Sequence, residues 1–184
     1  MATAQSQDKR CRLDLELFVL ALIARGISTP YQLSREASLS PGATLPVLAR
    51  LMEAGSIRRG AVGPRGRVEH TLTATGQRRL KGEWQDLLKA SPASDIESVL
   101  RVAALSTMCA APKKVVAAFL KDAAKARSAD SKKRKQELLQ AGPSIAGTGA
   151  EIYKQMLAQQ TVVRLAAEAA LLRKLAVSLP KLMQ

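Results

Sequence analysis

The sequence predicts a mainly α-helical protein, and three observations support this fold class. Hydrophobic residues make up 47% of the 184 residues, but only 3% are aromatic. A core built from Leu, Val, Ile, Met and Ala suits the packing of helices better than the packing of sheets. Helix-starting pairs of a hydroxyl residue and proline recur along the chain, whereas the alternation typical of strands is confined to residues 57–72.

The first two helices are predicted from their composition and their ends. Residues 13–25 are apolar on nearly every side, which indicates a helix that is buried all round, and Gly26 ends it. Thr29, Pro30 and Gln32 have the spacing of a capping box with proline in the first helical position. They predict a short second helix from Pro30 to about residue 37.

The third helix is predicted to begin at Pro41, after the capping residue Ser40, and to end before Gly55. Helical spacing places Leu48, Leu51 and Met52 toward the core. The opposite side of this helix is then expected to face outward, with Ala43, Pro46, Val47, Arg50 and Glu53.

Two strands are predicted at residues 57–62 and 67–72, followed by a fourth helix at 74–89. Between the strands lies the turn Gly-Pro-Arg-Gly at 63–66. The single histidine, His70, shares one strand face with Val68 and Leu72, so we expect a packed, hydrogen-bonded side chain rather than a metal ligand. Two helices followed by a strand, an arginine-bearing turn and a second strand form the order of a winged helix-turn-helix, which places one helix in the major groove of DNA.

The second half of the chain is predicted to be a helical arm, with residues 91–94 as the boundary between domains at 1–90 and 91–184. Ser94 and Glu97 predict a capping box before its first helix. The last helix, from 151 to about 179, has a heptad seam that requires a partner helix. We favour a second copy of the chain as that partner, with packing inside the same chain as the alternative. The residues assigned to dimerisation are Leu17, Val162, Leu165, Ala169, Leu172, Ala176 and Leu179.

The charge of the chain indicates a polyanionic partner. It has 29 Lys and Arg against 15 Asp and Glu, a formal net charge of +14 and a pI near 10.4. The basic run at 132–135 is more simply explained as a solvated helix face than as a nucleic-acid patch. The candidate contacts to double-stranded DNA are Tyr31, Ser40, Ala43, Thr44, Pro46, Val47, Arg50, Arg58, Arg59, Arg65 and Arg67.

Other classes of protein receive little support from the residues. One histidine, and no glycine-rich phosphate loop or G-x-S-x-G motif, give no basis for an enzyme. Cys11 and Cys109 are too few and too far apart for a metal site, so we expect no metal and no cofactor. The longest apolar run, at 17–24, is much shorter than a membrane span, and no secretory signal is recognised. We therefore expect a cytoplasmic protein with no membrane partner.

The predicted third helix and hairpin resemble those of the PadR family of transcriptional regulators, and the resemblance extends more loosely through Trp84 into the helical second half. It implies a homodimer that binds a palindromic operator, most simply as a repressor, and it leaves open a small-molecule effector. The residues that resemble the recognition helix are Ser40, Pro41, Gly42, Pro46, Leu48, Arg50, Leu51, Gly55 and Ile57. Those that resemble the wing and the following helix are Arg65, Gly66, Arg67, Leu72, Thr73 and Gly76.

The chain departs from the family pattern at positions that would face DNA. Ala43 and Leu45 stand where threonine and tyrosine are common, and Glu69 and His70 stand where an aromatic pair is common. These differences remove polar groups that could reach bases. They keep open an alternative in which the winged module binds an acidic protein partner instead of DNA.

Overall fold

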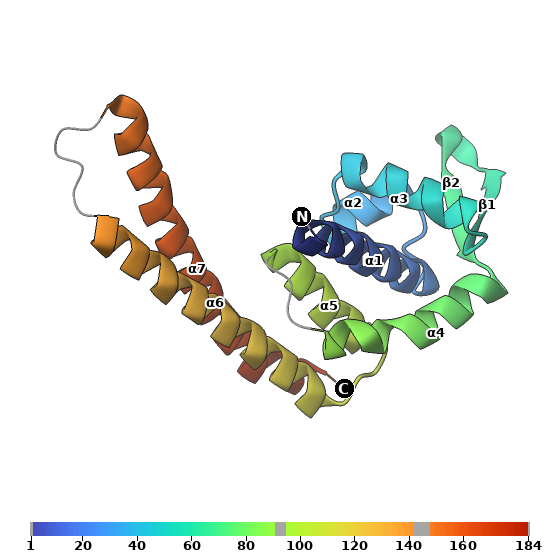
Figure 1. Ribbon diagram of the computed structural model, residues 1–184. Helices are drawn as coiled ribbons and strands as arrows, with labels where there is room; N and C mark the ends of the chain where they lie inside the picture. Colours follow the sequence, from blue (N-terminus) through green and yellow to red (C-terminus); the bar gives the residue numbers. More distant parts are fainter. Residues whose placement is uncertain (1, 91–94, 142–147, 184) are drawn as a thin grey trace. The chain divides into compact units, whose positions relative to one another are not determined.

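The chain is mainly helical and has one two-stranded antiparallel sheet, as the computed structural model shows (Figure 1). The structure describes the backbone of residues 2–90, 95–141 and 148–183, and the side chains of 12–64, 66–90, 95–140 and 148–183. These residues form α1 (Ala2–Ala24), α2 (Pro30–Ala37), α3 (Pro41–Glu53), β1 (Ile57–Val62), the 3-10 turn η1 (Pro64–Gly66), β2 (Val68–Leu72), α4 (Ala74–Lys89), α5 (Ile96–Met108), α6 (Lys113–Ala141) and α7 (Gly149–Leu182).

The chain divides into two compact units, Met1–Ala111 and Pro112–Gln184. This division falls later than the predicted boundary after residue 90, because α5 packs on α1 and α4 and so belongs to the first unit. Val99, Val102 and Leu105 on α5 are buried in this packing. Asp95 caps α5 by accepting hydrogen bonds from the backbone amides of its first turn, and the predicted cap Ser94 lies outside the described residues.

The core of the first unit is built around α1, which packs against α3, α4, α5 and β2. Leu17, Val19 and Leu20 are fully buried there, as expected for a helix that is apolar on all sides. Leu17 was predicted to help form a dimer. With no exposed surface, its side chain is occupied by the core of its own unit and is not available to a partner.

A buried carboxylate joins α1 to α5. Asp14 on α1 accepts a hydrogen bond from the Ser98 hydroxyl, and Nε of Arg101 lies 3.4 Å from one of its oxygens. Burial raises the pKa of Asp14 above its ordinary value, although the hydrogen bond from Ser98 and the charge of Arg101 oppose this effect. The two helices are therefore held by a specific polar contact inside an otherwise apolar interface.

The predicted ends of α2 and α3 are confirmed. Thr29 and Gln32 form the capping box. The backbone amide of Gln32 donates to Thr29 Oγ1 at 3.2 Å, and the backbone amide of Thr29 donates to Gln32 Oε1 at 3.1 Å. The Ser40 hydroxyl accepts from the third residue of α3 at 3.3 Å. Gly55, which follows α3, has a φ of 62°, a left-handed conformation that glycine adopts without strain.

The hairpin pairs Ile57 with Leu72 and Arg59 with His70, and one extra residue in β1 forms a bulge before Val62 pairs with Val68. The second strand begins one residue later than predicted, at Val68. His70 is buried and lies against Ser28, whose carbonyl oxygen is 3.0 Å from the His70 amide nitrogen and 3.1 Å from its Nδ1. The prediction of a packed, hydrogen-bonded histidine is confirmed.

The junction between β2 and α4 fixes the hairpin to the end of α3. The Thr73 hydroxyl donates to the Gly55 carbonyl oxygen at 2.6 Å and accepts from the Gly76 amide at 3.2 Å as the cap of α4. Gly76 is buried, and its backbone passes directly beside the Ser56 carbonyl oxygen. A side chain at this position has no space.

The second unit is a hairpin of α6 and α7. The side chain of Arg127 on α6 is almost fully buried, and its Nε lies 3.0 Å from a carboxylate oxygen of Glu168 on α7. The Ser131 hydroxyl donates to the Val162 carbonyl oxygen at 3.0 Å. The heptad seam of α7 packs on α6 of the same chain, which buries it. The alternative of packing inside the same chain therefore describes this seam. The buried seam residues are Leu165, Ala169, Leu172 and Ala176, with Val162 and Leu179 half-buried.

We expect Gly76→Ala to lower the free energy of unfolding of the first unit by about 1–3 kcal/mol or more. The added methyl group would overlap the Ser56 carbonyl oxygen and would lie 2.9 Å from Leu72 Cδ2. Gly82→Ala on the same helix is the matched control, because the added group meets nothing within 4 Å apart from its chain neighbours and the backbone of its own helix. It should stabilise the protein by up to about 1 kcal/mol. Urea unfolding of both variants measures the difference, and equal stabilities would contradict the close contact.

Candidate nucleic-acid interface

A groove of about 1260 Å³ lies within the first unit, between the helix pair α2–α3 and the β-hairpin. Its wall on α2 includes Tyr31 and Arg35, and its wall on the hairpin includes Arg59 and Arg67. The first turns of α2 and the hairpin are joined through the Ser28 contact of the buried histidine described above. The groove is thus formed by elements that are fixed to one another.

The floor of the groove is apolar. Leu45, Ala49 and Met52 on α3 line it, with Leu45 55% and Met52 37% exposed. None of these side chains can donate or accept a strong hydrogen bond. The exposed side of α3 can therefore make van der Waals contacts with a partner, but little hydrogen-bonded recognition.

The rim of the groove is mainly basic, with three arginines against one exposed carboxylate, that of Glu36. Arg35, Arg59 and Arg67 come from three different elements, and all three are exposed. Arg67 lies 3.3 Å from Glu69, but both side chains are more than half exposed. Ion pairs of this kind contribute little in water, so the Arg67 guanidinium remains available to an anionic partner.

The structure brings together only part of the predicted DNA-binding set. Tyr31, Arg59 and Arg67 line the groove. Ser40 and Pro46 are exposed near the start of α3 but are outside the groove lining, and Ala43 is half-buried. Arg58 is exposed on β1 and donates to Thr71 Oγ1 at 3.0 Å. The side chain of Arg65 lies outside the described residues.

Two predicted contacts on α3 are wrong because the helix is rotated relative to the predicted orientation. Thr44 is fully buried, where its hydroxyl donates to the Ser40 carbonyl oxygen at 2.8 Å, and Val47 is buried beside Leu48. Met52, predicted to face the core, is exposed. Apolar residues occupy both sides of α3, so hydrophobic spacing alone does not distinguish the two orientations.

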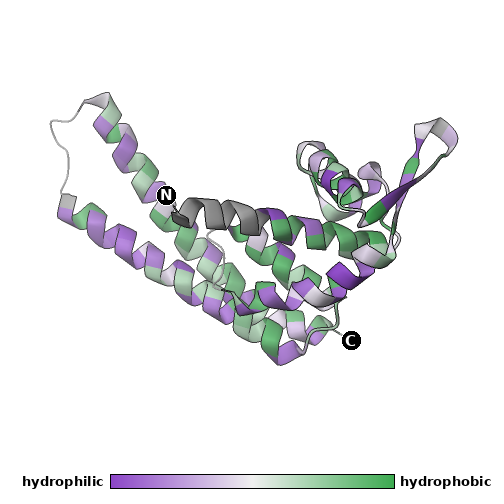
Figure 2. Ribbon diagram, turned by 45° about the vertical axis from the view of Figure 1, so that its right-hand side comes forward, coloured by the Kyte–Doolittle hydropathy of each residue, from purple (hydrophilic) through white to green (hydrophobic). Residues whose placement is uncertain are grey.

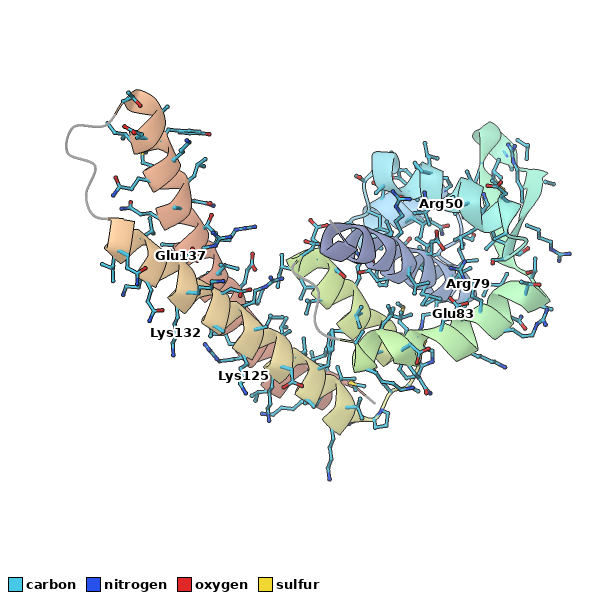
Figure 3. All side chains as sticks on the ribbon, viewed as in Figure 1. Arg50, Arg79, Glu83, Lys125, Lys132 and Glu137 are labelled. Atoms are coloured by element: carbon cyan, nitrogen blue, oxygen red, sulfur yellow. The ribbon has the colours of Figure 1, made fainter. Side chains whose placement is uncertain are left out.

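Arg50 is also placed differently from the prediction. Its Nε lies 3.0 Å from Oε1 of Glu16 on α1, whose other oxygen is 2.7 Å from Nη2 of Arg79 on α4. Nε of Arg79 in turn lies 3.0 Å from Glu83, and Figure 3 shows Arg50, Arg79 and Glu83 in this part of the first unit. Burial lowers the pKa of Arg79, but hydrogen bonds to Glu16 and Glu83 more than offset it, so the pKa lies above its ordinary value. Arg50 thus joins α3 to α1 rather than facing the groove.

Most of the groove lining is absent from the predicted DNA-binding set, including the exposed residues Arg35, Leu45, Ala49 and Met52. A signal for three of them was present, since positions 45, 49 and 52 have helical spacing. Their apolar character argued for burial. Arg35 could have been found from its place in the last turn of α2, close to the start of α3.

Other kinds of site find no support in the part of the chain that is described. No group of three or more His, Cys, Asp or Glu side chains there could hold a metal ion. Among the described helices, none combines the length and the hydropathy needed to cross a bilayer. Comparison with known proteins matches the chain to no family model and to no curated protein.

We expect Arg50→Gln to lower the free energy of unfolding by about 1 kcal/mol, because Glu16 is mostly buried and loses one of its two arginine partners. Arg35→Gln is the matched control, since Arg35 is exposed and forms no ion pair with the described residues. Chemical denaturation of the two variants gives the comparison. An equal effect of both changes would show that the Arg50–Glu16 contact does not stabilise the first unit.

Proposed function

We propose that the chain is a DNA-binding transcriptional regulator, with residues of α2, α3 and the hairpin acting as a winged helix-turn-helix similar to that of the PadR family. The observation that carries this proposal is the groove, in which arginines from α2, β1 and the hairpin turn region surround the exposed side of α3. A helix and a β-hairpin that carry cations on one shared face suit the curved, anionic surface of duplex DNA.

In this proposal the arginines of the groove supply most of the affinity for DNA, and its apolar residues supply the sequence preference. Arg35, Arg59 and Arg67 would contact phosphates and fix the register of the protein on the duplex. Leu45 and Met52 would meet the major groove, where the methyl group of thymine is the base feature that an apolar side chain recognises. Sequence preference would then rest on thymine positions, and most of the binding free energy would be electrostatic.

Binding of this kind would change transcription by occupying promoter DNA, and the family resemblance favours repression. A homodimer would present two winged modules to a palindromic operator. A small-molecule effector that controls release from DNA is compatible with the same proposal. No further cofactor is required.

We propose that the dimer forms through the side of α7 that α6 leaves uncovered. Met156, Val163 and Val177 are at least 60% exposed there, and Ala170 between them is exposed. Their spacing of 7 and 14 residues makes a second heptad row, on the side of α7 roughly opposite the row that packs on α6. A second copy of α7 would present the same row and could cover it symmetrically.

A second candidate function is favoured by one observation. The floor of the groove has apolar residues and no side chain suited to reading base edges, while its rim is basic. An amphipathic segment of an acidic protein would place its apolar side on Leu45 and Met52 and its carboxylates on the arginines. This is the alternative that the departures from the family pattern also leave open.

We expect the triple variant Arg35→Gln, Arg59→Gln and Arg67→Gln to weaken binding to duplex DNA and to reduce its salt dependence. Loss of three phosphate contacts in each module should make the slope of log affinity against log salt less steep by about 2.7 for each module. Fluorescence anisotropy with a labelled genomic or selected duplex, titrated across salt concentrations, gives this slope.

The matched control for this experiment is Arg78→Gln, Lys81→Gln and Lys89→Gln, which removes the same charge from exposed positions on α4. It should change the slope much less. If both triple variants bind DNA as the unchanged protein does, the groove is not the DNA-binding surface and the proposed winged-module function is wrong. Loss of binding to an acidic amphipathic peptide in the groove variant alone would then support the second candidate.

We expect Met156→Glu with Val163→Glu to convert a dimer into a monomer of 19.7 kDa, because two like charges would face each other across the proposed contact. Leu157→Glu with Ala166→Glu adds the same charge on the two flanks of the exposed side of α7 and should leave the dimer intact. Sedimentation equilibrium measures the mass, and circular dichroism checks that the helices persist. A monomeric unchanged protein would exclude this dimer.

A further inference from the structure

Most of the excess positive charge of the chain lies in the second unit. Residues 112–184 contain 14 Lys and Arg against 5 Asp and Glu, whereas residues 1–111 contain 15 against 10. The proposed winged module therefore accounts for the smaller part of the net charge. The helical hairpin needs a separate explanation for its charge.

Four lysines of α6 form a straight row, which we name the lysine stripe: Lys114, Lys121, Lys125 and Lys132. Their spacing of 7, 4 and 7 residues returns to the same side of an α-helix at each step. All four side chains are exposed. With a rise of 1.5 Å per residue, the stripe extends over about 27 Å.

The lysine stripe faces away from α7. The opposite side of α6, which carries the buried residues Val116, Leu120 and Ala123, packs on α7. Lys125 and Lys132 lie on the outer side of α6 in Figure 3, and hydrophilic residues recur along α6 in Figure 2. The hairpin thus keeps its apolar contacts inside and presents the stripe to a partner.

The stripe is not neutralised by the described part of the chain. None of its four lysines forms an ion pair with a described residue, and the ion pair between Arg134 and Glu137 on the same helix lies off the stripe. Asp122 is exposed beside Lys121 and Lys125, and Asp130 is exposed on another side of α6. One flanking carboxylate leaves the stripe strongly positive.

We propose that the lysine stripe binds the phosphate backbone of duplex DNA, separately from the contacts of the winged module. Duplex DNA carries about one charge per 1.7 Å of axis, so a row of about 27 Å faces many phosphates. Lysine ammonium groups on flexible stems bind phosphate as point charges and need no fixed register. The stripe therefore adds affinity without adding sequence preference.

The surroundings of the stripe favour DNA over an anionic membrane. A helix that lies in a membrane interface inserts apolar residues beside its lysines. Between these lysines the exposed side of α6 has small residues such as Ala118 and Ala129, and Val115 is the one large apolar residue exposed within the stripe, while Val116, Phe119 and Leu120 are buried. A protein partner would also need several apolar anchors, which the stripe lacks.

The test uses the full chain with Lys114, Lys121, Lys125 and Lys132 changed to Gln. On a duplex of about 40 base pairs, the slope of log affinity against log salt should become less steep by about 3.6 for each chain bound, since each phosphate contact contributes about 0.9. The matched control changes Lys113, Lys133, Lys154 and Lys181 to Gln, which removes the same charge from exposed positions off the stripe. Its slope should change by less than 1.

The length of the duplex provides a second readout. A duplex of about 40 base pairs offers more binding positions than one of about 12, which alone strengthens the observed binding. The affinity of the unchanged protein should rise by more than this statistical factor, whereas that of the stripe variant should rise only by the factor itself. Equal effects of the stripe and control variants would overturn the proposal. Loss of binding to phosphatidylserine vesicles with unchanged DNA binding would also overturn it and would identify a membrane partner.

The inference rests on the proposed function only in that both involve duplex DNA, and the variants separate them. If the groove variant binds as tightly as the unchanged protein while the stripe variant does not, the stripe is supported and the winged module is not the DNA-binding surface. If only the groove variant is impaired, the proposed function is supported and the stripe is excluded.

Discussion

Glu16 is the side chain on which the arrangement of the first unit depends. Its two oxygens hold Arg50 of α3 and Arg79 of α4 at 3.0 and 2.7 Å, so one carboxylate on α1 fixes two further helices. The contact to Arg50 is made in the same rotation of α3 that buries Leu48 and Leu51. In that rotation Val47 enters the core, while Leu45 and Met52 form the floor of the groove. The contacts of α3 inside the unit thus determine which of its side chains the outer surface presents.

The sequence predicted the ends of elements well, because local hydrogen bonding decides them. The starts of α2 and α3 follow from Thr29 and Ser40, whose side chains accept the first free amides, and the end of α3 follows from Gly55. The division into units was less accessible, since it depends on packing of α5 against α1. The rotation of α3 was predicted only in part: Leu48 and Leu51 are buried as expected, but Val47 and Met52 are exchanged, because apolar residues lie on both sides of the helix and the partner Glu16 is 34 residues away.

The heptad seam of α7 predicts that another helix packs on it, but it does not show whether that helix belongs to the same chain. The spacing of Leu165, Ala169 and Leu172 requires another helix, and α6 meets that requirement within the chain. Two of the buried seam residues, Ala169 and Ala176, are small. Arg127 and Glu168 fix the register of the two helices by a buried ion pair. What the seam leaves for partners is the outside of the hairpin, apolar along α7 and basic along α6.

The bulge in β1 changes which faces the side chains of the hairpin occupy beyond it. Between the pair Arg59–His70 and the pair Val62–Val68, β1 has one residue more than β2, so the alternation of faces in the two strands is offset at the tip. The half of the hairpin near the core is held by His70, while the tip beyond the bulge follows its own alternation. Gains or losses of two residues at the tip would preserve which side chains face the groove. A single-residue deletion at the tip would move the side chains beyond it to the opposite face of the hairpin, while the base of the hairpin would stay unchanged.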